Sequence, residues 1–305
     1  MKNLNIIKAI TLFSAVIFLQ AFSATGAKAA NCSELGSGEV PSVVDGEREC
    51  TTSPTSLVFK IYELSLCQTA ITPTTSATEK AESCSTIFES SSGQEVDLSP
   101  GKVFPLKSDI SITEGTYTNG LLKMHITQSM KTQFQFPDSR TANGSNGSGA
   151  YCFSNGSDIS TSPGASESHL TCHSSAFSTV ANTNTFNQFG EPDSSSNFQM
   201  NQASASNTIN GVSASTNLYI LDSDSTQSTG DITYSGFEPV LGSNDRTFIL
   251  ADQTLSSPVN IGPNTSTIDI QFNVTGSSSI IFETSSPHDV FENTFNGLIF
   301  IFSAN

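Results

Sequence analysis

The stretch from Leu122 to Phe136 constrains the fold more than any other part of this sequence. Its even-numbered positions are mostly apolar and its odd-numbered positions are all polar. Successive side chains of a β-strand point to opposite faces, so this period of two predicts a long strand with one face in a core and the other in water. Two even positions, Gln128 and Thr132, are polar, and we expect a bend or bulge near them. The stretch predicts the central strand of an antiparallel sheet.

Further strand patterns lie on both sides of this stretch. Residues 267–274 alternate in the same way, and a Gly-Ser-Ser turn at 276–278 predicts a hairpin with residues 279–283. Residues 297–302 are apolar at almost every position, which predicts a buried last strand. A turn at 91–93 is expected to separate two short strands. The remaining predicted strands are 57–66, 86–88, 95–98, 103–106, 110–112, 217–221, 232–234, 247–250 and 258–261.

Residues 138–216 differ in character, because Ser, Asn, Gly and Thr dominate them. Such composition predicts mobile loops near residue 143, while the recurring Phe residues later in the segment favour short strands or a draped insertion. We therefore predict a single domain over residues 31–305 with a polar insertion at about 138–216. The alternative is two separate β modules, residues 31–137 and residues 217–305.

The first 30 residues have the features of a cleaved signal peptide. Lys2 and Lys8 precede an apolar run, and Ala27-Lys28-Ala29 offers a small-residue cleavage site. No later segment is long and apolar enough for a transmembrane helix. Three of the 12 basic residues but none of the 28 acidic ones lie in this leader, so the mature chain carries a net charge of −19. That charge disfavours nucleic acid as a partner, because polyanions repel phosphate.

The exported part contains six cysteines, an even number that predicts three disulfides in an oxidising compartment. Fifteen pairings are formally allowed for six cysteines. Sequence order and short separations favour neighbours pairing, and each such bridge closes a loop of roughly 20 residues and stabilises by about 3 kcal/mol. The favoured pairs are Cys32–Cys50, Cys67–Cys84 and Cys152–Cys172.

The approach to the central strand carries a Gly followed by a Tyr, at Gly115 and Tyr117. In extracellular sandwiches a tyrosine at such a position closes a loop over the sheet end through a hydrogen bond from its phenol to the backbone. The layout of residues 55–136 resembles the immunoglobulin-like or prealbumin-like sandwich domains of bacterial surface proteins. The resemblance rests on pattern and implies an all-β fold, an antiparallel β-sandwich with a Ser/Asn-rich insertion, but it brings no functional residues with it.

Two clusters contain residue types that bind metals. Asp222 and Asp224, with Asp231 shortly after, offer oxygens at alternate positions of a turn, which is a candidate calcium site although the full calcium-loop motif is missing. His169 and His173 flank Cys172 and could bind zinc or copper, but the cysteine is expected in a disulfide and the setting offers no helix. The alternative for the first cluster is an ordinary acidic turn between strands, and for the second it is two solvated histidines beside a disulfide.

No catalytic signature stands out: the Gly-x-Ser-x-Gly elbow, the His-Glu-x-x-His motif and phosphate-binding glycine loops are all missing. The leading prediction is an exported bacterial protein of the periplasm, cell surface or extracellular space, structural or adhesive and without catalytic activity. Its partners would be a surface glycan or protein, or further copies of itself through the C-terminal apolar strand. The rival prediction is a secreted hydrolase or glycan-binding module with its site on the 138–216 loops.

Overall fold

A computed structural model describes most of residues 29–305. The described residues are 29–44, 47–99, 112–143, 146–157, 169–185, 202–209, 212–226, 232–235, 238–241, 246–283, 289–295 and 297–305. The greater part of the predicted leader, the predicted strand at 103–106, nearly all of that at 110–112, and Asp231 lie outside these residues.

The described residues are mostly β-structure, as the sequence predicts, with one α-helix, α1 (Ala77–Ser83), and one short 3-10 helix, η2 (Cys32–Glu34). The strands are β1 (Ala30–Asn31), β2 (Val43–Val44), β3 (Glu47–Thr52), β4 (Ser56–Cys67), β5 (Cys84–Asp97), β6 (Gly115–Lys131), β7 (Gln133–Ala142), β8 (Ser148–Ser154), β9 (Leu170–His173), β10 (Asn182–Thr185), β11 (Gln202–Ile209), β12 (Val212–Asp222), β13 (Ile232–Ser235), β14 (Glu238–Leu241), β15 (Arg246–Ile261), β16 (Ile268–Asn273), β17 (Ser278–Phe282), β18 (Asp289–Phe295) and β19 (Ile299–Ala304).

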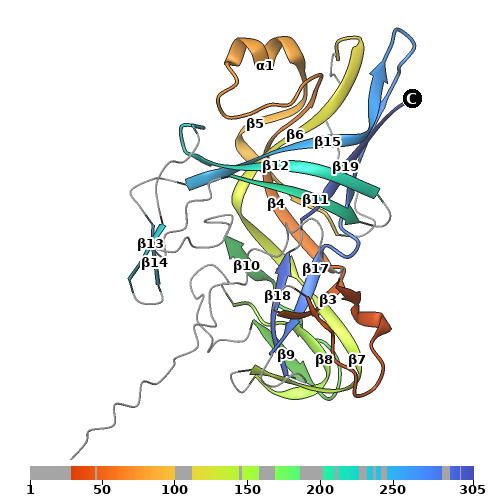
Figure 1. Cartoon of the computed structure of the whole chain (residues 1–305), viewed down its shortest axis with the longest axis vertical. Coiled ribbons are helices and arrows are strands. Elements are labelled where there is room, and N and C mark those ends of the chain that lie inside the picture. Colours follow the sequence, from red (N-terminus) through yellow and green to blue (C-terminus); the bar gives the residue numbers. More distant parts are fainter. Residues whose placement is uncertain are drawn as a thin grey trace, which may run out of the picture.

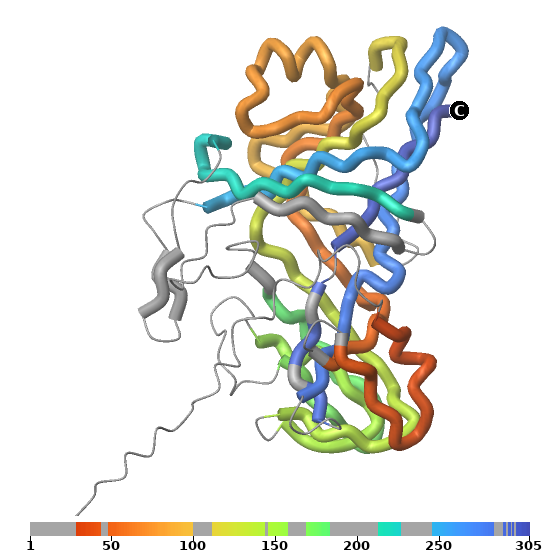
Figure 2. The backbone as a smooth tube through the Cα atoms, in the orientation of Figure 1, coloured from red at the N-terminus to blue at the C-terminus, as the bar shows by residue number. Residues whose placement is uncertain are grey.

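Two large sheets organise these strands. The upper sheet in Figure 1 has the order β11-β12-β15-β6-β4-β5, with β10 added to β6. The lower sheet has the order β1-β3-β17-β18-β7-β8-β9, with β2 added to β3. Most pairings are antiparallel; β1 with β3 and β18 with β7 are parallel. Each sheet combines strands from before residue 138 with strands from after residue 216, and Figure 2 shows red N-terminal and blue C-terminal segments side by side in the lower part.

The long alternating stretch is confirmed as β-structure, and its side chains alternate between buried and partly exposed over most of its length. From Leu122 to Lys131 every even residue is buried and every odd residue is partly exposed, and this includes the polar Gln128. The expectation of one strand in one sheet is wrong, however. The chain leaves the upper sheet at the end of β6 and enters the lower sheet as β7, and the break falls at Thr132, one of the two positions where a bend was expected.

A buried polar network, the Thr132 junction, surrounds this crossing. Its five members are all 0% exposed: Thr132, Ser154, Asn182, Ser278 and Asn293. The Thr132 N–H donates to Ser154 Oγ at 3.3 Å, and the Ser154 N–H donates to Thr132 O at 2.9 Å. Thr132 Oγ1 also lies 3.1 Å from Ser278 Oγ and accepts from Asn293 Nδ2 at 3.3 Å. Asn182, on β10, donates to Asn293 Oδ1 at 2.7 Å and so links the two sheets.

The inner face of the upper sheet carries the larger core. Apolar residues of β4, β6, β12 and β15 pack there against β16 and β19, which pair with each other. Residues 122–136 and 267–274 therefore share one core in part, through Leu122 to Met130. The predicted hairpin of 267–274 with 279–283 is wrong, because β16 pairs with β19 while β17 pairs with β18 and β3. A second core lies on the lower sheet.

Two residues fix how closely β19 approaches the upper sheet. A Cβ at Gly120 would lie 2.5 Å from the Phe300 ring and 2.7 Å from the Phe302 ring, so only glycine allows this contact. The buried side chain of Gln253 donates to Phe300 O at 2.6 Å and accepts from the Phe300 N–H at 3.2 Å. The amide therefore takes the place of a neighbouring strand at this point of β19, whose apolar side chains Ile299, Phe300 and Phe302 are buried.

The three disulfides are the pairs that sequence order favours: Cys32–Cys50, Cys67–Cys84 and Cys152–Cys172. Their presence indicates an oxidising compartment outside the cytoplasm. The predicted role of Tyr117 is also confirmed, because its phenol donates to Thr113 O at 2.6 Å and lies 2.8 Å from Ser85 Oγ.

Two pairs of predicted short strands are single long strands in the structure. β5 is one strand where a turn at 91–93 was expected, and Gly93, at a φ of 71°, is absorbed as an irregularity within it. The predicted strands at 247–250 and 258–261 are likewise one strand, β15, with an irregular register between Thr254 and Val259. The disulfide-closed loop 68–83 contains α1, which Ser76 and Glu79 begin with a capping box.

The polar segment 138–216 contributes strands to both sheets. β8 and β9 belong to the lower sheet, and β10, β11 and the first part of β12 to the upper one. Phe177 packs edge-on against Tyr151 and Phe153, at centroid distances of 5.1 and 6.2 Å. Short strands in the insertion, one of the two expected forms, are therefore present. The division of the chain into one domain or two stays a prediction.

Gly120→Ala should reduce the free energy of unfolding by about 1–3 kcal/mol, because the added methyl group overpacks the contact with Phe300 and Phe302. Chemical denaturation of the purified mature chain measures the change. Gly262→Ala is the matched control, since a Cβ there meets no atom within 4 Å. Equal stability of the two variants would contradict the close approach of β19.

Candidate binding surface

An irregularity in β4 places two consecutive side chains on the outer face of the upper sheet. The register of β4 with both β5 and β6 shifts between Ile61 and Glu63. Ile61 and Leu64 point into the core, so Tyr62 and Glu63 lie between two inward residues and both face outward. A bulge of this kind re-aims side chains at the surface of a sheet.

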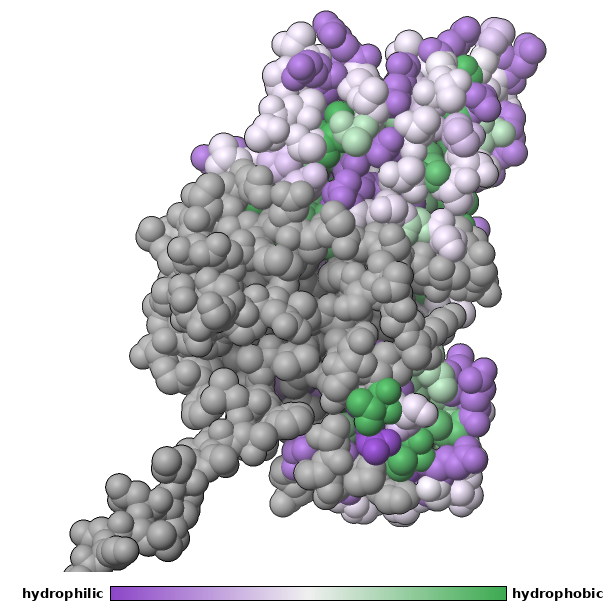
Figure 3. Space-filling view, in the orientation of Figure 1, coloured by the Kyte–Doolittle hydropathy of each residue, from purple (hydrophilic) through white to green (hydrophobic). Residues whose placement is uncertain are grey.

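Four half-exposed side chains meet on this face, and we call them the Tyr62 patch: Lys60, Tyr62, Lys123 and Phe248. The Tyr62 and Phe248 rings pack edge-on at 4.8 Å between centroids. Lys123 Nζ lies 4.1 Å from the centroid of Phe248 and Lys60 Nζ lies 5.6 Å from that of Tyr62. The patch thus combines two aromatic rings with two cations. Figure 3, whose upper described part is mainly hydrophilic or neutral with small green hydrophobic areas, shows no broad apolar surface in that view.

A hydrogen bond to the turn after β12 holds Lys123 in place. Lys123 Nζ donates to Ser225 Oγ at 2.6 Å, and its burial lowers its pKa. Glu63, beside it, forms an ion pair of 2.6 Å with Lys80 of α1. The neighbouring His125 has a lowered pKa because of burial first and the charge of Lys60 second, so it is neutral at pH 7. The Tyr62 patch therefore presents two cations beside two rings, with the carboxylates of Glu63 and Glu89 close to Lys123.

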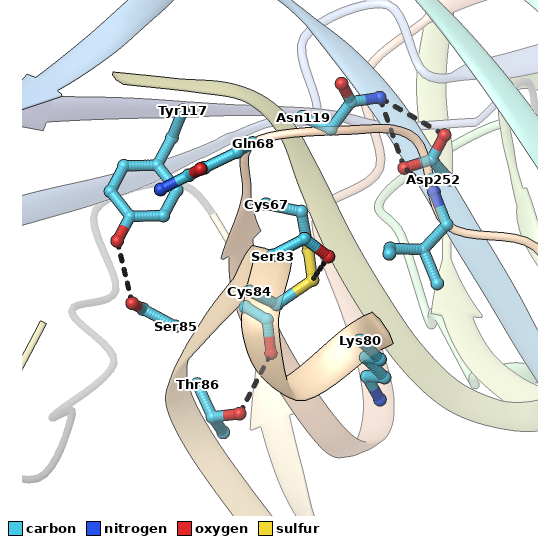
Figure 4. Close-up of a disulfide and its surroundings, with 12 residues drawn as sticks. Cys67, Gln68, Lys80, Ser83, Cys84, Ser85, Thr86, Tyr117, Asn119 and Asp252 are labelled. Carbon is cyan, nitrogen blue, oxygen red and sulfur yellow. Dashed lines mark hydrogen bonds between the residues drawn. A yellow bond between two sulfur atoms is a disulfide. The ribbon is translucent and has the colours of Figure 1, made fainter. Parts of the chain in front are cut away.

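The loop 68–83 covers the adjacent half of the same face. Ile71, 2% exposed, packs into an apolar cluster whose other buried members are Cys67, Leu121, Tyr219, Leu221 and Leu250, with Phe248 at its margin. Beneath the loop, Asp252 is 1% exposed. Figure 4 shows Asn119 directed at its carboxylate, close to the Cys67–Cys84 disulfide.

His169 lies beside a carboxylate that the sequence does not single out. Its Nδ1 is 3.6 Å from Oε1 of Glu292 on β18, and the two side chains are 3% and 2% exposed. Burial raises the pKa of Glu292, while the neighbouring imidazole opposes this shift. His173 is exposed at the end of β9, and Cys172 is in its disulfide. The structure therefore does not bring His169, His173 and Cys172 together as one metal site.

The acidic turn after β12 is described only in part. Asp222 ends the strand, and Asp224 Oδ1 accepts from the N–H of Thr226 at 2.9 Å and from its Oγ1 at 2.7 Å, which lowers the pKa of Asp224. Asp231 lies outside the described residues. Within the ranges that the structure describes, no three His, Cys, Asp or Glu side chains form a metal-binding group. Calcium binding by Asp222, Asp224 and Asp231 stays a prediction.

The sequence did not single out Lys60, Lys123 or Phe248 as candidate binding residues. Their meeting depends on the order of β4, β6 and β15 in the sheet and on the bulge at Tyr62, and neither is visible in a local pattern. Lys123 did carry a signal, because it lies at an odd, outward position of the alternating stretch.

No protein-family model, no curated protein and no solved structure matches this chain. Among the described residues, no helix is long and apolar enough to span a membrane.

If the acidic turn binds calcium, saturating Ca²⁺ should raise the melting temperature of the mature chain by about 5 °C, because a ligand of the folded state stabilises it by mass action. The variant Asp222→Ala/Asp224→Ala should lose this shift, while Asp269→Ala, an exposed carboxylate elsewhere, should keep it. A melting temperature that neither Ca²⁺ nor EDTA changes would rule the site out.

Proposed function

We propose that the protein is an exported, non-catalytic protein of the bacterial cell surface or periplasm, with a structural or adhesive role. In this proposal residues 31–305 form a single antiparallel β-sandwich with a polar insertion. The three disulfides support a location outside the cytoplasm. The observation that carries the adhesive role is the Tyr62 patch, an aromatic and cationic surface on the outer face of a sheet.

The chemistry of the Tyr62 patch favours an acidic surface glycan as partner. Aromatic rings give a large, flat contact area at low entropic cost, which suits the apolar face of a sugar ring. Lysine ammonium groups attract carboxylate or sulfate substituents as point charges. The mature chain is otherwise strongly acidic, so an anionic partner meets the least repulsion where cations gather. Tyr62, Phe248 and Lys123 lie close enough to contact one sugar chain together.

A second copy of this acidic chain is the competing partner, because its surface charge is also complementary to the patch. The C-terminal strand gives less support to self-association, since its apolar residues Ile299, Phe300 and Phe302 pack inside the same chain. Light scattering over a range of concentrations separates the two partners.

A secreted hydrolase is the second candidate, and the pair His169–Glu292 is the observation that favours it. An imidazole next to a carboxylate of raised pKa is an arrangement that acid–base catalysis uses. Both side chains are almost fully buried, so a substrate would need an opening of the structure to reach them. This geometry supports a structural pair more strongly than a catalytic one.

Binding to a polyuronate such as alginate tests the adhesive role. The variant Tyr62→Ala/Lys123→Ala should weaken binding of the mature chain to immobilised alginate by about tenfold or more, because it removes one ring and one cation. Retention on immobilised dextran, which is neutral, should be weak for parent and variant alike.

The control variant is Tyr151→Ala/Lys131→Ala, which removes a half-buried tyrosine with its own aromatic partner and a half-buried lysine elsewhere. It should bind alginate like the parent. Equal loss in both variants, or no alginate binding by the folded parent, would refute the glycan proposal. Melting curves of each variant exclude unfolding as the cause.

A further inference from the structure

Residues 68–83, which we call the lid, are attached at one end and laid over the sheet. The Cys67–Cys84 disulfide closes the base of the loop, and the Gln68 N–H donates to Ser83 O at 2.8 Å just above it. Thr118 Oγ1 of β6 donates to Gln68 O at 2.9 Å. The base is thus fixed to the upper sheet, and Figure 1 shows α1 at the far end of the molecule, next to β5.

Two contacts hold the body of the lid against the sheet. The Lys80–Glu63 ion pair joins α1 to β4 at the bulge. On the other side the Ile71 N–H donates to Asp252 Oδ1 at 3.3 Å, and the Ile71 side chain covers Leu121 and Leu250. The second contact is unusual, because it buries a carboxylate.

Asp252 receives hydrogen bonds from three elements, and among the described residues it forms no ion pair. Asn119 Nδ2 on β6 lies 3.2 Å from each carboxylate oxygen, and the side chain of Asn217 on β12 also bonds to it. The titratable side chain that faces it is Tyr219, also on β12. A buried carboxylate without a cation pays a desolvation cost that hydrogen bonds offset only in part.

We propose that residues 68–83 form a proton-linked lid, which Asp252 holds closed over the outer face of the upper sheet in mild acid and releases more readily at neutral pH. Opening uncovers the apolar surface of Leu121, Tyr219, Leu221 and Leu250, which continues from Phe248 of the Tyr62 patch. The lid itself does not depend on what that patch binds.

The direction in which pH changes the opening of the lid follows from the linkage between closure and protonation of Asp252. With the lid closed, burial raises the pKa of Asp252 from 3.8 to about 6, although the bonds from Ile71, Asn119 and Asn217 oppose the shift. With the lid open, water reaches the carboxyl group and its pKa returns toward 3.8. The closed state therefore binds the proton more tightly, so closure is favoured below pH 4 and weakens as the pH rises to 6. Between pH 5 and pH 7 the opening equilibrium constant should rise about tenfold and then level off.

Three other ionisable groups near the lid have shifted pKa values, and His125, beside Lys123 on the open part of the face, has a pKa lowered from 6.5 by burial. Tyr219 has a raised pKa, from burial first and Asp252 second, and stays neutral. Glu79, within the lid, has its pKa lowered by hydrogen bonds to Ser76 and stays ionised. Lys123, near the edge of the lid, has a pKa lowered from 10.5 mainly by burial, while the charges of Glu63 and Glu89 oppose this shift. Asp252 is the group that bonds directly to the lid and has a pKa within this interval, so we assign the response to it.

Hydrogen exchange of the full mature chain, read by mass spectrometry, tests the lid. After correction for intrinsic exchange rates, peptides covering residues 68–83 should lose protection about tenfold between pH 5 and pH 7. Peptides covering β8 (Ser148–Ser154) serve as the internal control and should not change. Unaltered protection of the lid across this interval would overturn the proposal.

Asp252→Asn is the matched variant, because an amide oxygen still accepts from Ile71 but does not titrate. In this variant the protection of residues 68–83 should be the same at pH 5 and pH 7. If its protection changed with pH as much as that of the parent, the proposal would also be overturned. If this variant does not fold, the parent alone tests the proposal. The protection of residues 68–83 in the parent should stop falling once the pH has passed about 6, the pKa of Asp252 with the lid closed. A transition centred at another pH would assign the effect to a different group and overturn the proposal.

Discussion

The whole architecture depends on how the chain crosses from one sheet to the other at Thr132. A strand that changes sheets carries backbone groups into a buried region where no neighbouring strand is in register to pair with them, and each unpaired group there costs about 1–3 kcal/mol. Ser154 meets this need, since its hydroxyl accepts from the Thr132 N–H and its own N–H donates to Thr132 O. The buried Thr132 hydroxyl bonds in turn to Ser278 and Asn293, and Asn182 bonds to Asn293. These four residues lie on β8, β10, β17 and β18. The bonds that surround Thr132 therefore also join the upper sheet to the lower one.

The arrangement of the two sheets decides which face of the upper sheet is free to bind a partner. The inner face of the upper sheet is filled by β16 and β19, which Gly120 admits and Gln253 anchors. Surface chemistry is therefore left to the outer face, which has an open half around Tyr62 and a half covered by residues 68–83. The bulge at Tyr62–Glu63 serves both halves, because Tyr62 contributes to the open patch while Glu63 holds α1 through Lys80.

The sequence was informative where local rules act alone. From Leu122 to Lys131 the period of two foretold which side chains of β6 are buried, because a strand alternates whatever its partners are. The polar Gln128, where a bend was expected, is buried as well. Short spacing foretold the disulfides, and Tyr117 bonds to a carbonyl only four residues away. The failures concern pairing at a distance. A turn signal at 276–278 suggested that β17 follows β16 in a hairpin, but β17 has a better partner in β3, more than 200 residues earlier in the chain. Glu292 could not be identified from the sequence for the same reason, because it lies next to His169 only where β9 and β18 come together in the fold.

The pairing of β3 with β17 has a consequence for how the protein is made. The lower sheet joins residues 47–52 to residues 278–282, so it cannot be completed until nearly the entire chain is available. Contacts of such long sequence separation form slowly, and an unpaired strand is exposed to aggregation while it waits. Each disulfide, in contrast, spans 20 residues or fewer and needs only its own neighbourhood. The bridges Cys32–Cys50 and Cys152–Cys172 can therefore form early in folding. They keep these segments of the lower sheet compact until β17 and β18 are available to pair.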